Sequence, residues 1–169
     1  MLLYLILYQN AMLHITLSSL SLLVWLFLNL GSSRWGKFIL LFVYFLKKME
    51  YISIALQLIV GVSILNVWLI QANKATQWRG GSATTIKEEF AAYGLPEWSV
   101  YVIGFLKVAL AIALISAIWF PVLLKPAALG LAFLLTGSVL MHFKIKDPIK
   151  KSFPAFLFLL MCLFLAFVV

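Results

Sequence analysis

Acidic residues are scarce in this sequence. Its 169 residues hold five Asp and Glu against thirteen Lys and Arg, a formal net charge of +8, and no acid precedes Glu50. Charged residues make up 11% of the chain, less than half the share of about a quarter that is usual in soluble domains. A basic soluble protein would suggest a nucleic-acid partner. Here the Lys and Arg lie between apolar runs, where they set membrane topology, so we expect no nucleic-acid partner.

Cysteine and histidine are almost missing as well. Cys162 is the one cysteine, so the chain can form neither an intrachain disulfide nor a C-x-x-C redox pair. His14 and His142 are the two histidines, too few for a multi-ligand zinc or haem site within the chain. We therefore expect no metal site and no intrinsic cofactor.

Hydrophobic residues, in contrast, make up 65% of the chain. After position 50, long apolar runs recur that are long enough, or nearly so, to cross a hydrocarbon core of about 30 Å. They are residues 51–72, 99–120, 122–143 and 152–169. Helices satisfy every backbone hydrogen bond without help from lipid. The sequence therefore predicts an all-α integral membrane protein, a bundle of four transmembrane helices.

One long polar stretch, residues 74–98, interrupts the apolar runs. Thr85-Ile-Lys-Glu88 has the form of a capping box, with Thr85 as the N-cap and Glu88 reaching back. An apolar stripe follows at Ile86, Phe90 and Tyr93, and the sequence Gly-Leu-Pro then ends the helix. The pattern predicts a short amphipathic helix that lies on the membrane surface or caps the bundle.

The loops around this helix carry four residues that we place at the membrane interface. Trp78 and Arg79 precede the helix, and the Trp78-Arg79-Gly-Gly sequence is read either as a lid or anion-binding loop or as a lipid-headgroup anchor and turn. Glu97 follows the helix. Asp147 lies among basic neighbours and is expected to be an ion-pair partner in its loop.

Polar side chains below the surface lie at similar depth on three predicted helices. Lys107 lies about eight residues into its helix, roughly 12 Å from the end that meets residues 74–98. A charged side chain in a membrane is costly and often marks a site. The coincidence predicts a ligand pocket formed by Asn66, Lys107, Thr136, Ser138 and His142. The alternative for the lysine is snorkelling, in which its long stem carries the ammonium toward water.

Loop charge predicts the orientation of the bundle. Loops 73–98 and 144–151 lie on one side of a four-helix topology and hold seven of its loop cations. The other side holds Lys125, joined by Lys47 and Lys48 if the N-terminal extension is counted. Because Lys and Arg are enriched in cytoplasmic loops, we expect both loops 73–98 and 144–151 to be cytoplasmic.

The first 48 residues differ from the rest. Residues 11–30 are long enough to span a membrane, although His14, Thr16 and three Ser interrupt them, while residues 38–46 are too short. One interpretation is that the natural start is Met49 and that residues 1–48 are translated upstream DNA. The other is a genuine extra helix followed by a re-entrant or interfacial segment. We therefore separate a hydrophobic N-terminal extension, 1–48, from a membrane domain, 49–169.

The sequences "GLPEWSVYVIGFLKVALAIALI" and "GSVLMHFKIKD", followed by a Pro-containing apolar last helix, resemble the DoxX-like membrane proteins. The resemblance covers about residues 50–169 and leaves 1–48 unmatched, which favours the Met49 start. Its motifs are Gly94-x-Pro96-Glu97, Gly104-x-x-Lys107, and His142 before Asp147; many relatives have a Glu where this chain has Lys107. The resemblance implies a four-helix protein of the bacterial inner membrane, in a family with some members linked to quinone-dependent thiosulfate oxidation or oxidant defence.

Three functions are compatible with these features. The first is an accessory or binding subunit linked to membrane redox chemistry, with a quinone or a lipid as candidate ligand. The second is a quinone-reducing oxidoreductase subunit, and the third is a small-solute transporter, which the lack of an inverted repeat argues against. The lack of a catalytic constellation favours the first and leaves enzyme activity open. The expected partners are the lipid bilayer, a membrane redox protein and a second copy of the chain.

Overall fold

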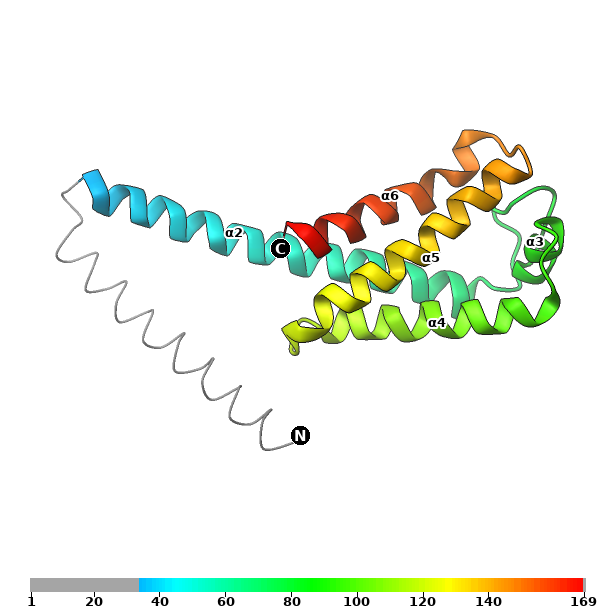
Figure 1. The fold of residues 1–169 in the computed structure, drawn as a ribbon, viewed down its shortest axis with the longest axis horizontal. Helices are drawn as coiled ribbons and strands as arrows, with labels where there is room; N and C mark the ends of the chain where they lie inside the picture. The colour runs from blue at the N-terminus through cyan, green and yellow to red at the C-terminus, as the bar shows by residue number, and fades with distance from the viewer. Residues whose placement is uncertain (1–33, 169) are drawn as a thin grey trace, which may run out of the picture. The chain divides into compact units, whose positions relative to one another are not determined.

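The computed structural model describes residues 34–168. The chain divides into two compact units, Met1–Met49 and Glu50–Val169. The helix packing, the pocket and the loop contacts described below all belong to the second unit. In chain order the elements are α2 (Arg34–Leu65), the π-helical turn η1 (Asn66–Ile70), α3 (Ile86–Ala92), α4 (Glu97–Ser116), the 3₁₀ turn η2 (Pro121–Leu123), α5 (Leu124–Lys144) and α6 (Ile149–Phe167) (Figure 1).

The described part of the chain is all-helical and has four helices long and apolar enough to cross a membrane, Lys37–Ile70, Glu97–Ser116, Pro121–Lys144 and Ile149–Phe167. This confirms the predicted class, an all-α membrane protein with four spanning helices. Large apolar side chains point outward, as expected when the solvent is lipid: Phe105 is 72% exposed and Phe133 is 79% exposed.

The first spanning helix begins earlier than predicted. We expected a span over 51–72 and a separate short segment at 38–46, but α2 runs without a break from Arg34 to Leu65. The chain has no Gly or Pro between positions 37 and 60, so nothing in the sequence stops the helix there. Residues 11–30, the other predicted hydrophobic segment, lie outside the described residues.

Glycines on α2 and α4 let these two helices pack closely. A Cβ at Gly61 of α2 would lie 2.5 Å from the Ile115 side chain, and one at Gly104 of α4 would lie 2.7 Å from the Trp68 ring. Small residues at such contacts favour helix association in a membrane, where no hydrophobic drive between helices exists. The buried core of the bundle, including Leu114, Leu131 and Leu165, joins α4, α5 and α6.

The predicted short helix is present as α3 and caps the bundle. The Thr85 side chain accepts a hydrogen bond from the Glu88 N–H at 3.2 Å, as predicted for the N-cap. Glu88 differs from a standard capping box, because its carboxylate accepts hydrogen bonds from the Thr84 N–H (2.7 Å) and hydroxyl (2.8 Å). Ile86 and Phe90 are buried, and the cluster that they form also contacts Trp68 of η1.

A Schellman turn ends α3. The Leu95 N–H binds the Phe90 carbonyl and the Gly94 N–H binds the Ala91 carbonyl. Gly94 has a φ of +75°, which glycine adopts at little cost. The chain then enters α4 within three residues, so the apolar face of α3 stays against the bundle.

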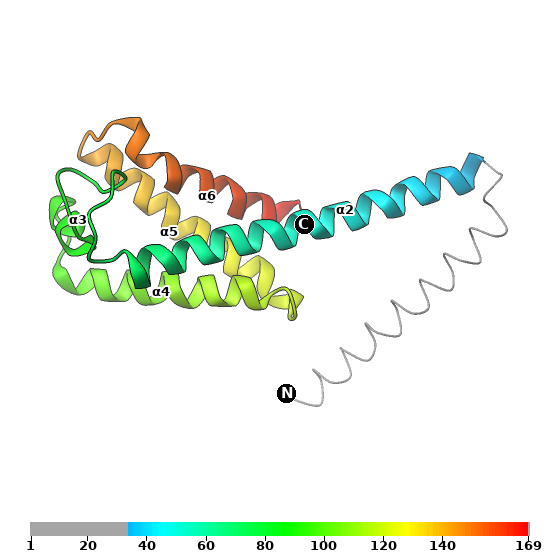
Figure 2. The ribbon, with the colours of Figure 1, turned by 180° about the vertical axis from the view of Figure 1, so that it is seen from behind.

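The two polar loops lie at the same end of the bundle (Figures 1 and 2). The Gly81 N–H donates to Asp147 at 3.0 Å, and the Lys144 ammonium donates to the Tyr93 carbonyl at 2.8 Å. Loops 73–98 and 144–151 therefore meet at one end of the bundle.

Candidate ligand pocket

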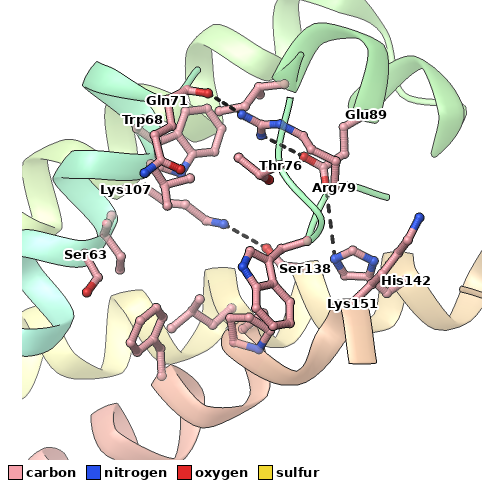
Figure 3. A pocket seen from close by; sticks show the side chains of 18 of the residues that line it. Ser63, Trp68, Gln71, Thr76, Arg79, Glu89, Lys107, Ser138, His142 and Lys151 are labelled. Carbon is pink, nitrogen blue, oxygen red and sulfur yellow. Dashed lines mark hydrogen bonds and ion pairs between the residues drawn. The ribbon is translucent and has the colours of Figure 1, made fainter. Parts of the chain in front are cut away.

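A pocket of about 330 Å³ opens at this end of the bundle. It lies between α2 with η1, α4, α5 and α6, with α3 and residues 76–79 beside it (Figure 3). Its aromatic lining is Trp68, Trp78, Phe90, Tyr93 and Phe158. Its charged and polar lining is Ser63, Asn66, Gln71, Thr76, Arg79, Glu89, Lys107, Ser138, His142 and Lys151.

Four of the five predicted pocket residues line this pocket, and Thr136 does not. Asn66, Lys107, Ser138 and His142 face it from three helical segments. Thr136 is exposed, and its hydroxyl binds the Ala132 carbonyl of its own helix at 2.9 Å. The physical reason is helical periodicity: residues two positions apart are separated by about 200°, so Thr136 and Ser138 lie on opposite faces. Depth alone could not distinguish them.

Lys107 is buried, with 7% of its surface exposed. Its ammonium donates to the Ser138 hydroxyl at 2.8 Å and lies 5.4 Å from the centre of the Trp68 ring. Ser138 in turn donates to the Leu134 carbonyl at 3.1 Å. Figure 3 shows the lysine reaching toward Ser138. Its ammonium is therefore held inside the pocket and is not snorkelling to the surface.

Arg79, which the sequence places in the interfacial loop, is also buried, at 5% exposure. Its guanidinium pairs with the Glu89 carboxylate at 3.1 Å and donates to the carbonyl of Gln71. The segment that follows η1 and the Glu89 carboxylate of α3 thus both bind the guanidinium. Its Nε has no hydrogen-bond partner among the described residues.

We call α3 and residues 76–80 the roof of the pocket. Glu89 is the central hydrogen-bond acceptor of this roof. Its second carboxylate oxygen accepts hydrogen bonds from the Tyr93 hydroxyl at 2.8 Å and from the Gly80 N–H at 2.9 Å. Burial, followed by the nearby Glu89 carboxylate, raises the pKa of Tyr93, so this phenol stays protonated. The Tyr93 hydroxyl also lies 3.3 Å from His142 Nε2 and so links the roof to α5.

Asp147 holds the opposite nitrogen of His142. Its carboxylate lies 2.7 Å from His142 Nδ1 and 3.7 Å from the Lys151 ammonium, and it is 5% exposed. Burial opposes the charge of this carboxylate, but the hydrogen bonds from His142 and the Gly81 N–H, with the Lys151 charge, lower its pKa overall. The expected ion-pair role is therefore present, together with a His142 contact that the sequence did not suggest.

The two remaining residues of the predicted interfacial loops, Trp78 and Glu97, lie in different places. Trp78 is 38% exposed and lines the pocket. Glu97 begins α4 and pairs with Lys87 at 3.0 Å; both side chains are more than half exposed, and neither lines this pocket. Within residues 34–168 no three His, Cys, Asp or Glu side chains gather closely enough to hold a metal ion.

Sequence reasoning missed Glu89, Tyr93 and Trp68 as pocket residues. A signal existed for two of them, because Tyr93 stands four residues after Glu89 in an otherwise apolar stripe. A buried Tyr hydroxyl needs a polar partner, and residues four apart meet on a helix. Trp68 gave no signal, since an aromatic residue within an apolar run normally contacts lipid or core.

Comparison with known proteins gives one finding. No curated protein and no solved structure matches the chain. The model of the DoxX-like family matches residues 75–164, which contain most of the pocket and more than half of the chain. The resemblance expected over about 50–169 is thus found from the polar loop to α6, and the chain belongs to the DoxX-like family.

Proposed function

We propose that this DoxX-like membrane protein is an accessory or binding subunit that holds a small amphipathic ligand, of the quinone or lipid class, in the pocket beneath α3. The observation that carries the proposal is Lys107. Its ammonium is buried at the end of a membrane bundle, faces a pocket of about 330 Å³ and, among the described residues, hydrogen-bonds with Ser138 alone. Such a cation is costly unless a ligand uses it.

The lining fits a ligand with a flat or narrow body and an oxygen-bearing head. Ligand pockets are mostly apolar with a few convergent polar groups and measure about 300–1,000 Å³. Trp68 and Phe158 provide apolar faces, while Lys107 and Asn66 provide donors. A quinone ring has both properties, since its carbonyl oxygens accept hydrogen bonds and its ring stacks on aromatic side chains.

An accessory role follows from the scarcity of redox groups in the sequence. The chain has one cysteine, so it has no thiol pair to reduce a bound quinone. We therefore assign the electron supply to a membrane redox partner. The exposed apolar faces of the bundle contact lipid and leave room for that partner or for a second copy of the chain.

We place the protein in the bacterial inner membrane with loops 73–98 and 144–151 in the cytoplasm. The support is the charge asymmetry of the loops, because Lys and Arg favour the cytoplasmic side. The pocket would then open toward the cytoplasmic half of the membrane.

Binding of a short-chain quinone to the purified protein in nanodiscs tests the proposal. Ser63 lines the pocket, whereas its neighbour Val62 is 55% exposed on the outside of the helix. We expect Ser63→Phe to fill part of the pocket and weaken quinone binding about tenfold or more, and Val62→Phe to bind as the wild type does. Absence of binding to the wild type, or equal binding by Ser63→Phe, would contradict the proposal.

The same preparation distinguishes an accessory subunit from an enzyme. Reduction of the quinone by the purified protein alone, on addition of a reduced sulfur compound, would overturn the accessory role. We expect reduction only when a membrane fraction containing the partner is added.

A further inference from the structure

Lys107 forms no ion pair with an acidic side chain in the part of the chain that the structure describes. The chain has five acids, and all of them lie in the part that the structure describes. Glu89 pairs with Arg79, Glu97 with Lys87, and Asp147 with His142 and Lys151. Glu88 is bound to Thr84, and Glu50 is exposed outside the pocket. None lies within 4.0 Å of the Lys107 ammonium.

The ammonium is also short of hydrogen-bond acceptors. A protonated lysine has three N–H donors. The structure gives Lys107 one acceptor, Ser138, and places the face of the Trp68 ring 5.4 Å away. Two donors of a buried cation therefore have no hydrogen-bond acceptor among the described residues, and the lysine lines the pocket. A buried charge without a counter-charge is costly, so an anion in the pocket would offset that cost.

The other charges of the pocket are already balanced. Arg79 is matched by Glu89 at 3.1 Å, and Lys151 by Asp147 at 3.7 Å. The excess positive charge is therefore that of Lys107. Arg79 Nε, which is buried and has no partner among the described residues, adds a second donor on the pocket wall.

We infer that the ligand of this pocket is a monoanion, an amphipathic molecule with one charged oxygen group, a carboxylate or a phenolate, seated against the Lys107 ammonium. Its apolar body lies along Trp68, Trp78 and Phe158. This inference rests on the proposed function, since it names the class of ligand that the same pocket takes.

Two matched pairs of probes test the charge. Decanoate and decanol share a tail and differ in charge, as do 2-hydroxy-1,4-naphthoquinone, which is ionised at neutral pH, and 1,4-naphthoquinone. Binding is measured to the protein in phosphatidylcholine nanodiscs, with empty nanodiscs subtracted. We expect the wild type to prefer the anionic member of at least one pair by about tenfold.

Three variants assign that preference to Lys107. Lys107→Met should bind the neutral and the anionic probe equally well, while Lys107→Arg keeps the charge and should keep the preference. Lys125→Met removes an exposed cation at the opposite end of α5 and should behave as the wild type does. If Lys107→Met fails to fold, the ratio of anionic to neutral probe binding on Lys107→Arg and on the wild type still tests whether the pocket prefers the anion.

The outcomes separate the two proposals. If no probe binds the wild type, the proposed function is overturned. If neutral and anionic probes bind equally, or if Lys107→Met keeps the preference, the monoanion is overturned while the pocket remains a binding site. Preference within the decanoate pair alone indicates a lipid-type acid, and within the naphthoquinone pair alone an ionised quinone; both support the inference.

Discussion

At the scale of single residues, the roof of the pocket depends on a glycine, because a side chain at position 80 would clash with Tyr93. A Cβ at Gly80 would lie 2.6 Å from the Tyr93 hydroxyl, the group that joins Glu89 to His142. Gly80 therefore serves two purposes, since its N–H also donates to Glu89. The sequence shows two adjacent glycines, which indicate a flexible turn, but not that one of them faces a tyrosine.

We predict that Gly80→Ala lowers the free energy of unfolding by about 1–3 kcal/mol, because the methyl group displaces the Tyr93 ring. Gly137→Ala is the matched control, because a Cβ there meets nothing within 4 Å and α5 is helical at that point. It should be neutral or stabilise the protein by up to about 1 kcal/mol. Unfolding in mixed detergent measures both; equal stability of the two variants would contradict the proposed contact.

Asp147 makes the stability of the protein depend on pH. Its pKa is lowered in the folded state. The stability that this carboxylate contributes is therefore complete above its unfolded pKa of about 3.9 and is lost as the pH falls below that value. We predict that Asp147→Asn is less stable than the wild type at pH 7 and loses less stability between pH 5 and pH 3.

Detergent unfolding at a series of pH values checks this prediction. Glu88 also has a lowered pKa, owing to its bonds to Thr84, so part of the acid dependence should remain in the Asp147 variant. Parallel curves for wild type and Asp147→Asn would show that the carboxylate is not held by His142 and Gly81 as the structure has it.

At the scale of elements, α3 is a short helix that depends on its cap and its buried face. Seven residues are too few for a helix to be stable alone, so the Thr85 cap and the packing of Ile86 and Phe90 maintain it. The capping pattern and the apolar stripe both predicted this helix from the sequence. That the stripe closes over a pocket was not predicted, because its contacts come from η1 and α4, distant in the chain.

We predict that Thr85→Ala costs about 1 kcal/mol of stability, since the Glu88 N–H loses its acceptor. Hydrogen exchange should rise over residues 86–92 and stay unchanged over α5. Ser82→Ala, at an exposed position three residues earlier, is the control and should change neither quantity. Unaltered exchange in the Thr85 variant would mean that packing alone maintains α3.

At the scale of the whole molecule, the arrangement of loops follows from the number of spans. Two polar loops separated by two spanning helices must return to the same side, and the contacts between Gly81 and Asp147 agree. Which side faces the cytoplasm depends on the membrane and on the distribution of charge.

Cysteine accessibility tests this topology. In a Cys162→Ser background, Lys74→Cys and Lys146→Cys should react with an impermeant maleimide only from the cytoplasmic side, and Lys125→Cys only from the opposite side. Labelling of positions 74 and 146 from different sides would contradict the fold. Labelling of both from outside would contradict the orientation alone.

The sequence by itself determined the class of protein, the spanning helices after position 50 and the capped short helix. These are local properties, since apolar length, capping and helical rise need no knowledge of distant contacts. The sequence analysis failed at the start of α2. It separated residues 38–46 from the span at 51–72, although no residue between them signals a break in the helix.

Only the tertiary structure decided which polar groups meet. Thr136 and Ser138 have similar depth, but helix rotation sends one to the outside and the other to Lys107. The sequence places Arg79 in the interfacial loop but does not show that Glu89 pairs with it. The partner of a buried charge is set by packing between distant segments, and among the residues that the structure describes that packing gives acidic partners to Arg79 and Lys151 of the pocket but not to Lys107.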